Sequence, residues 1–194
     1  MKVLVVDSRG RGGILVEKYL ENRNVTEVLA VPGNDIMQIH KKVKIFPGIK
    51  LTEISKILKI AKENKVDLVD VAQDDAIAAG LVDLLQKSKI KVFGPTKKAA
   101  RIEWDKSFAR KFMKKFKLPI PKYKTFKSQK SAIKYLNNQF DQEYYIKASG
   151  LAGGKGAIYA KNKNDAIKGI DNMKKFGSAG RTFLIEECLH GEEF

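Results

Sequence analysis

The sequence has 194 residues, 43% of them hydrophobic, which is enough to bury one large domain or two small ones. No apolar run approaches the roughly 20 residues that cross a bilayer, which argues against a membrane partner; the single cysteine excludes an internal disulfide and fits a reducing, cytoplasmic compartment. The formal net charge of +16 favours phosphate-bearing ligands, but the lysines are spread over the whole chain, which is typical of a solvated surface rather than of a specific nucleic-acid interface.

The first 95 residues alternate between strand-like and helix-like segments. Short apolar runs predict strands at 3–6, 28–31, 67–71 and 91–93, and helical spacing predicts helices at 14–19, 51–63 (capped by Thr52) and 76–85. This alternation indicates a parallel sheet with right-handed crossovers. Ligands of such sheets bind beyond the carboxyl ends of the strands, which here are residues 7–13, 32–34 and 72–75.

The pattern changes after Pro95. Residues 97–116 are predicted to form two helices, with Asp105 as the N-cap of the second. In that helix the spacing predicts a buried stripe of Phe108, Phe112 and Phe116, and a solvent-facing set of Arg110, Lys111, Lys114 and Lys115. The prolines of 118–121 mark a boundary. We expect domains at 1–100 and 101–194, the second with a helical linker (97–121) and a lid-bearing subdomain (122–194).

A glycine-rich loop is the most informative segment of the second half. Around it, strands are predicted at 123–126, 144–147, 157–160 and 182–187, and helices at 131–136 and 165–173. The loop, 149–156, holds four glycines, whose N–H groups can wrap a polyphosphate, and Lys155 adds positive charge. It is not a Walker A loop, because Ser149 and Gly156 stand where that motif needs Gly and Ser or Thr. The alternative is a flexible hairpin.

Charged residues flank this loop. Lys147, at the inner end of a predicted strand, is costly to bury unless it meets an anion. Acidic residues of 186–193 follow another apolar strand and could hold the amine and hydroxyls of adenosine, or form a charged surface turn. His40 and His190 stand in no metal-ligand spacing, so no metal site is predicted.

Four segments carry a resemblance to a known family. They read FGPTKKAA (93–100), DKSFARKFM (105–113), KASGLAGGKG (147–156) and IEECLHGEE (185–193). In this order and spacing they make the chain similar, along its whole length, to the phosphoribosylamine–glycine ligase family of the ATP-grasp superfamily. The resemblance implies an α/β fold: an N-terminal, Rossmann-like parallel-sheet domain that precedes the first part of an α+β ATP-grasp domain.

The resemblance also implies roles for individual residues. The residues that match ATP contacts are Lys106 and Lys147 for the phosphates, Ala152, Gly153, Gly154, Lys155 and Gly156 for the lid, Glu186, Glu187 and Leu189 for adenine, and Glu193 for the ribose. The residues that match substrate contacts are Gly10, Arg11, Pro32, Gly33, Asn34 and Asp74. No residue of the chain matches a metal ligand.

The activity implied by the resemblance is ATP-dependent ligation of glycine to 5-phosphoribosylamine through glycyl phosphate, a step of purine biosynthesis. It would use ATP with Mg²⁺ or Mn²⁺ and would act on small-molecule substrates. The resemblance implies no specific nucleic-acid partner, and it implies that the full-length protein is a monomer. The metal-binding acids are expected beyond Phe194, so the catalytic residues stay unassigned. We therefore expect this chain to be a fragment that is inactive alone.

Two turns depart from the family pattern. Residues 7–13 read DSRGRGG, without the family's Arg-Glu-His run, and Ala72-Gln73-Asp74 replaces Gly-Pro-Glu. Because both turns lie where the amine substrate is expected, another ATP-grasp carboxylate–amine ligase stays open. The net charge leaves a basic nucleic-acid-binding module as a further alternative, and a nucleotide-binding remnant without ligase activity is the third.

Overall fold

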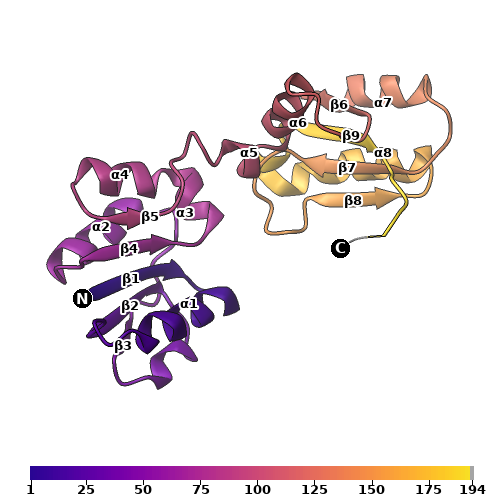
Figure 1. Ribbon diagram of the computed structural model, residues 1–194. Coiled ribbons are helices and arrows are strands. Elements are labelled where there is room, and N and C mark those ends of the chain that lie inside the picture. Colours follow the sequence, from indigo (N-terminus) through magenta and orange to yellow (C-terminus); the bar gives the residue numbers. More distant parts are fainter. Residues whose placement is uncertain (193–194) are drawn as a thin grey trace. The chain divides into compact units, whose positions relative to one another are not determined.

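The computed structural model describes residues 1–192 and divides into two compact units, Met1–Ala100 and a second that begins at Arg101. Each unit has its own sheet and its own core (Figure 1). No helix within residues 1–192 is long and apolar enough to span a membrane.

The first unit is built on a five-stranded parallel sheet. Its strands are β1 (Lys2–Asp7), β2 (Glu27–Pro32), β3 (Val43–Ile45), β4 (Leu68–Val71) and β5 (Val92–Phe93), in the order β3-β2-β1-β4-β5. The predicted parallel α/β class is confirmed. The three-residue strand β3 was not predicted, because only Val43 of it is buried and it follows a 3-10 turn, η1 (Met37–Ile39), rather than a helix.

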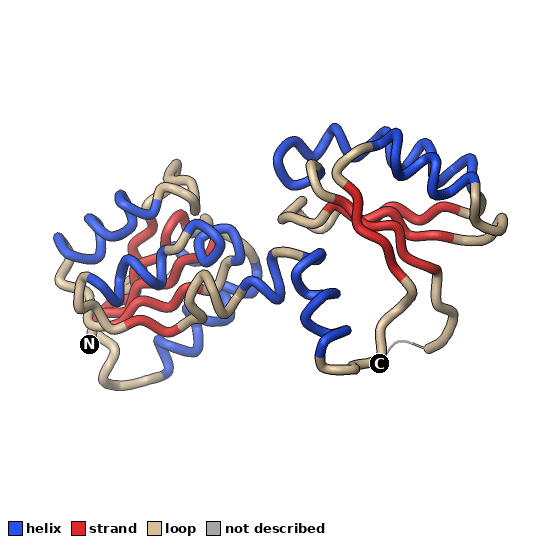
Figure 2. Tube along the Cα trace, turned by 90° about the horizontal axis from the view of Figure 1, so that it is seen from above, coloured by secondary structure: helices blue, strands red, loops and turns tan. Residues whose placement is uncertain are grey.

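Helices cover both faces of this sheet (Figure 2). They are α1 (Gly10–Glu21), α2 (Ile54–Glu63), α3 (Asp74–Ala79) and α4 (Leu81–Lys87). Alternate residues of β1 serve different layers: Val3 and Val5 join a buried cluster with Val16 of α1, while Leu4 and Val6 are buried on the opposite face. The reversal of strand order at β1 puts the crossover helices on opposite faces, since each crossover is right-handed.

Three local predictions in this unit are wrong. The first helix begins at Gly10, not Ile14, so the glycine-rich segment is its first turn. The predicted helix 76–85 is two helices, because Gly80 adopts φ 95° and ends α3 in the left-handed region. Thr52 does not cap α2: the N-cap position is Glu53, whose carboxylate instead accepts a hydrogen bond from the Lys50 amide at 2.8 Å.

The second unit is a four-stranded antiparallel sheet with helices on both sides. Its strands are β6 (Tyr123–Phe126), β7 (Tyr144–Ala148), β8 (Ala157–Ala160) and β9 (Phe183–Glu187), in the order β6-β9-β7-β8. Its helices are α5 (Arg101–Trp104), α6 (Lys106–Lys115), α7 (Gln129–Asn137), α8 (Lys163–Asn172) and the 3-10 segment η2 (Met173–Gly180). Figure 2 shows α7 and α8 on one face and α6 on the other.

Helix α6 is oriented differently from the prediction. The phenylalanine stripe is not buried: Phe112 is 38% and Phe116 is 55% exposed, whereas Ser107 and Ala109 are buried. Arg110, predicted to face water, instead contacts β9. The face that packs consists of the small residues Ser107 and Ala109 with Arg110 as its long cation, and such a face packs more closely than three aromatic rings would.

Candidate active site

The face of the second sheet opposite α7 and α8 carries charged side chains. Along β7 the residues Tyr144, Ile146 and Ala148 are buried in the core with those helices, so Lys147 lies on the other face. Lys147 pairs with Leu184, and Tyr145 pairs with Glu186, across the β7–β9 ladder. Lys147 and Glu186 therefore share one face.

Glu186 is the centre of this face. It is 1% exposed and receives both nitrogens of an Arg110 fork, Nε at 2.6 Å and Nη2 at 3.1 Å, while Lys147 Nζ lies 2.6 Å from its second oxygen. Burial alone would raise the pKa of the Glu186 carboxyl, but hydrogen bonds from Arg110 and Lys147 outweigh it and hold that pKa below its usual range. The carboxylate is thus charged and doubly paired.

Lys106 belongs to the same cluster. Burial lowers the pKa of its ammonium; the positive charges of Lys147 and Arg110 lower it further, and Glu103 and Glu186 oppose them. Lys106 is therefore close enough to Lys147, Arg110 and Glu186 for their charges to act on it. Lys106, Lys147 and Arg110 thus outnumber the two carboxylates, Glu186 and Glu103, that act on this cluster, and the remaining positive charge favours binding of an anion.

The first turn of α6 is fixed to the glycine loop. Asp105 caps the helix by accepting from the Phe108 amide at 3.1 Å, as predicted, and its same oxygen accepts from the Ser149 hydroxyl at 2.8 Å. The Lys106 amide donates to the Ser149 carbonyl at 2.8 Å. Burial would raise the pKa of Asp105, but these hydrogen bonds, with that of Arg101, outweigh it and hold the pKa below its usual value. Lys106 and the loop are consequently held together.

The loop itself is a hairpin between β7 and β8. Gly153 and Gly154 adopt φ values of 58° and 80° with open space around each, and the Lys155 amide closes the turn on the Ala152 carbonyl at 3.0 Å. Two consecutive positive φ angles favour glycine, as in type I′ turns. At its base, the Ala148 amide donates to the Gly156 carbonyl at 2.7 Å. The exposed tip leaves backbone donors available to an anion.

The remaining predicted nucleotide residues are more dispersed. Glu187 follows Glu186 and therefore lies on the opposite face of β9, where its carboxylate accepts from the Lys122 amide at 2.7 Å. Leu189 is 65% exposed, so its backbone is accessible for the predicted contact with adenine. Glu193 lies outside the described residues.

In the first unit, the predicted substrate residues gather at the carboxyl edge of the sheet. Strand order reverses between β1 and β4, which is where open α/β sheets bind ligands. There Asp7, fully buried, accepts from Gln73 Nε2 at 2.9 Å, and this bond joins the two strand ends. Gly12 makes room for Asp7, since a Cβ on Gly12 would lie 2.5 Å from the Asp7 Cβ.

The turn after β2 meets the same edge. The Gly33 amide donates to the Asp7 carbonyl at 3.1 Å, and Asn34 Nδ2 donates to the Ser8 carbonyl at 3.2 Å. Pro32 ends β2 in register with Asp7. Gly10 and Arg11 are exposed in the first turn of α1, and Asp74 is exposed as the first residue of α3. These residues line the edge where unpaired helix N–H groups are available.

Sequence reasoning missed Arg110 as a site residue, and it included Asp7 and Gln73 only within the ligand-edge ranges 7–13 and 72–75, without a role for either side chain. Arg110 was missed because the spacing of the phenylalanines predicts that they form the buried face of α6, which places Arg110 in solvent. The signal for a role of Asp7 and Gln73 is that each is polar and lies at or just after the carboxyl end of a buried strand, at the ligand edge of the sheet.

Comparison with known families identifies both units. Residues 1–103 match the model described as the phosphoribosylglycinamide synthetase N domain, and residues 104–194 match that family's ATP-grasp (A) domain. The chain is 39% identical over its full length to a phosphoribosylamine–glycine ligase of Streptococcus pyogenes and 40% identical to one of Streptococcus suis, covering 46% of each relative. The chain thus spans about half the length of the curated relatives it matches.

Solved structures give the same result for the fold. A phosphoribosylamine–glycine ligase of Thermotoga maritima matches with a TM-score of 0.73 at 25% identity, over 99% of this chain and 45% of that one. A biotin carboxylase domain of Hydrogenobacter thermophilus 2-oxoglutarate carboxylase matches with a TM-score of 0.75 at 17% identity, over 97% of this chain and 44% of that one. At this level of identity the match shows only a shared fold. The chain therefore belongs to the phosphoribosylglycinamide synthetase family.

Proposed function

We propose that this chain supplies the phosphate-binding and amine-binding parts of a ligase that joins glycine to 5-phosphoribosylamine, with ATP converted to ADP and phosphate. Family membership and the names of the relatives support the activity. The observation that carries it is the excess of cations beside the glycine hairpin, where Lys106, Lys147 and Arg110 outnumber the carboxylates of Glu186 and Glu103.

These residues fit the polyphosphate of ATP. The ammonium of Lys147 is 2.6 Å from Glu186, and the Lys147 side chain is 22% exposed, so it is both paired and within reach of a ligand. An incoming phosphate would compensate the charge that burial penalises at Lys106. The hairpin tip, Gly153 and Gly154, would donate backbone N–H groups from above. Leu189 would contact adenine through its backbone, with Glu186 beside it.

ATP supplies the phosphoryl group that turns a glycine carboxylate oxygen into a leaving group. The amine of the second substrate then forms the amide bond, and phosphate departs. Lys106 and Lys147 would offset the negative charge of the transferred phosphoryl group. The hairpin would exclude the water that hydrolyses an acyl phosphate. Preorganised cations are effective here because they need no reorientation during the reaction.

The amine substrate would bind at the carboxyl edge of the first sheet. Its phosphate suits the first turn of α1, where Gly10 and Arg11 offer backbone donors and a guanidinium. The Pro32–Asn34 turn and Asp74 would contact the ribose. The bond between Asp7 and Gln73 fixes the floor of this edge and differs from the family's usual residues, so a different amine acceptor is the second candidate function.

The test uses the gene product that contains this sequence. ADP formation should require both glycine and 5-phosphoribosylamine, and mass spectrometry should detect glycinamide ribonucleotide. Lys147→Met should lower kcat/KM at least 100-fold, whereas Lys134→Met, in α7 on the opposite side of the sheet, should leave it unchanged. ADP formation with another amine only would support the second candidate, and nucleotide binding without turnover would overturn both.

A further inference from the structure

We propose that Glu143, Cys188 and His190 form a zinc-binding site at the end of the second sheet. One carboxylate oxygen, the thiol sulfur and one imidazole nitrogen all lie within 4.8 Å of one another. Sequence spacing alone does not indicate this cluster, because Glu143 stands more than 40 residues from the other two. The pairing of β7 with β9 brings them together, and the Cys188 amide donates to the Glu143 carbonyl at 3.3 Å.

The three donor atoms are those that zinc prefers. Zn²⁺ binds thiolate at about 2.3 Å and imidazole or carboxylate at about 2.0–2.2 Å, with tetrahedral geometry. Three protein ligands leave the fourth position to water or another ligand. Mg²⁺, by contrast, requires near-octahedral oxygen coordination, so it would not compete for a site containing sulfur and nitrogen, and Mn²⁺ binds such donors more weakly than Zn²⁺ does.

The present contacts need only a small rearrangement to bind zinc. His190 Nε2 lies 2.6 Å from Glu143 Oε2, whereas two ligands with 2.0 Å bonds to a tetrahedral ion are roughly 3.3 Å apart. The pair must therefore open by about 0.7 Å to admit the ion between its atoms. The His190 side chain is 77% exposed, so little packing would resist this movement.

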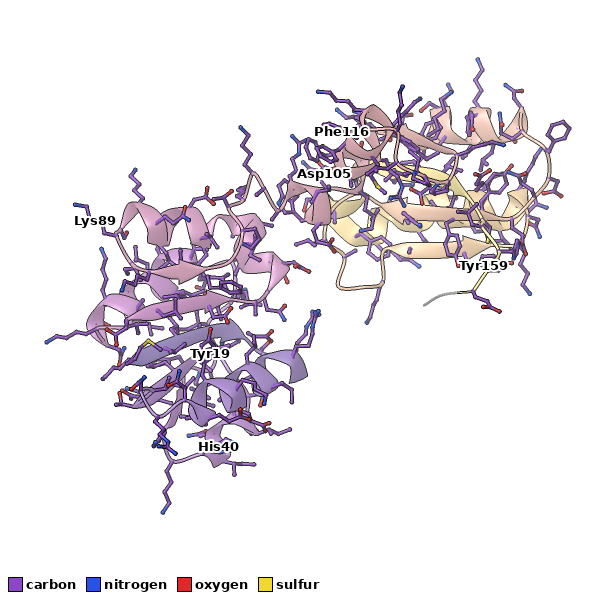
Figure 3. The ribbon with its side chains drawn as sticks, viewed as in Figure 1. Tyr19, His40, Lys89, Asp105, Phe116 and Tyr159 are labelled. Atoms are coloured by element: carbon purple, nitrogen blue, oxygen red, sulfur yellow. The ribbon has the colours of Figure 1, made fainter. Side chains whose placement is uncertain are left out.

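An outer contact already orients the carboxylate. The Tyr159 hydroxyl, from β8, donates to the other oxygen of Glu143. Figure 3 places Tyr159 beside the segment that leaves β9. Partners of this kind fix the direction of a metal ligand. The Cys188 thiol has a long contact of 3.9 Å to the Leu189 carbonyl, a weak bond that zinc ligation would easily replace.

Zinc at this site would restrain the segment after β9. Leu189 lies between two of the ligands, and under the proposed function its backbone contacts adenine. Occupancy of the site would then alter nucleotide affinity. That consequence rests on the proposed function, but the metal site does not, so its test omits nucleotide.

The experiment is a metal titration of the 194-residue chain after removal of metal with a chelator. Co²⁺ serves as the spectroscopic probe, because a thiolate ligand gives it a charge-transfer absorption. We expect one equivalent to bind, Zn²⁺ to displace it, and millimolar Mg²⁺ to leave it in place. Zinc should also slow alkylation of the Cys188 thiol at least tenfold, a measurement that needs no variant. Absence of both effects would overturn the proposal.

Variants distinguish zinc binding at this site from nonspecific zinc binding by other exposed side chains. Cys188→Ser should abolish the charge-transfer absorption and weaken zinc binding at least tenfold, and Glu143→Gln should weaken it at least fivefold. His40→Ala, which changes the other histidine of the sequence, is the matched control and should bind as the parent does. Zinc affinity that is equal in the parent and in Cys188→Ser, or that falls in His40→Ala instead, would contradict the assignment.

Discussion

Glu186 links three elements of the second unit through one side chain. Its carboxylate joins β9 to Arg110 of α6 and to Lys147 of β7. A buried carboxylate is costly when it loses its cationic partners. Arg110, Lys147 and Glu186 therefore hold one another in position. The arrangement positions Lys147 before any ligand binds, which lowers the entropy lost on binding a phosphate.

The pH dependence of stability follows from this pairing. The folded-state pKa of Glu186 is below the ordinary value of 4.5, so its contribution is fully present above pH 4.5 and is lost as the pH falls through the folded-state pKa. Urea unfolding at pH 7 and pH 4 should therefore show a smaller stability difference between the parent and Glu186→Gln at the lower pH. Glu21→Gln, which alters an exposed pair with Lys18, is the control and should show no such convergence. A constant difference for Glu186→Gln would contradict the shifted pKa.

At the scale of elements, the glycine hairpin and α6 form one assembly through Asp105 and Ser149. The sequence predicted the hairpin, the cap and most strands, because glycine, capping residues and apolar runs act through local geometry. It did not predict the orientation of α6 or the break at Gly80, since these depend on how closely a helix approaches distant residues. The same applies to the partners of Arg110.

The base of the hairpin should be intolerant of even one methyl group. A Cβ at Gly156 would lie 2.6 Å from the Ala152 Cβ and 3.2 Å from the Ala148 Cβ. Gly156→Ala should therefore lower the free energy of unfolding by about 1–3 kcal/mol, measured by urea denaturation. Gly13→Ala, in α1 with open space around it, should raise stability by about 0.5–1 kcal/mol. Equal effects of the two changes would argue against the close packing of the loop.

At the scale of the whole molecule, the net charge of +16 acts on every polyanion. DNA binding should therefore be weak, with Kd about 10⁻⁴–10⁻⁶ M at physiological salt, and insensitive to sequence. Fluorescence anisotropy at low and at physiological salt should show a steep loss of affinity as the salt rises. Tight binding that survives the higher salt and discriminates between sequences would favour the nucleic-acid-binding alternative.

Binding of nucleotide can be measured separately from turnover when glycine and the amine substrate are left out. The central claim is that a triphosphate is held by Lys106 and Lys147 beneath the hairpin. The most direct measurement is a titration of the isotopically labelled chain with ATP, followed by two-dimensional amide NMR. We expect saturable shifts concentrated at Lys106, Lys147 and residues 152–156, with none at Lys134 of α7. Shifts scattered over the lysine-rich surface, with residues 152–156 unchanged, would contradict it.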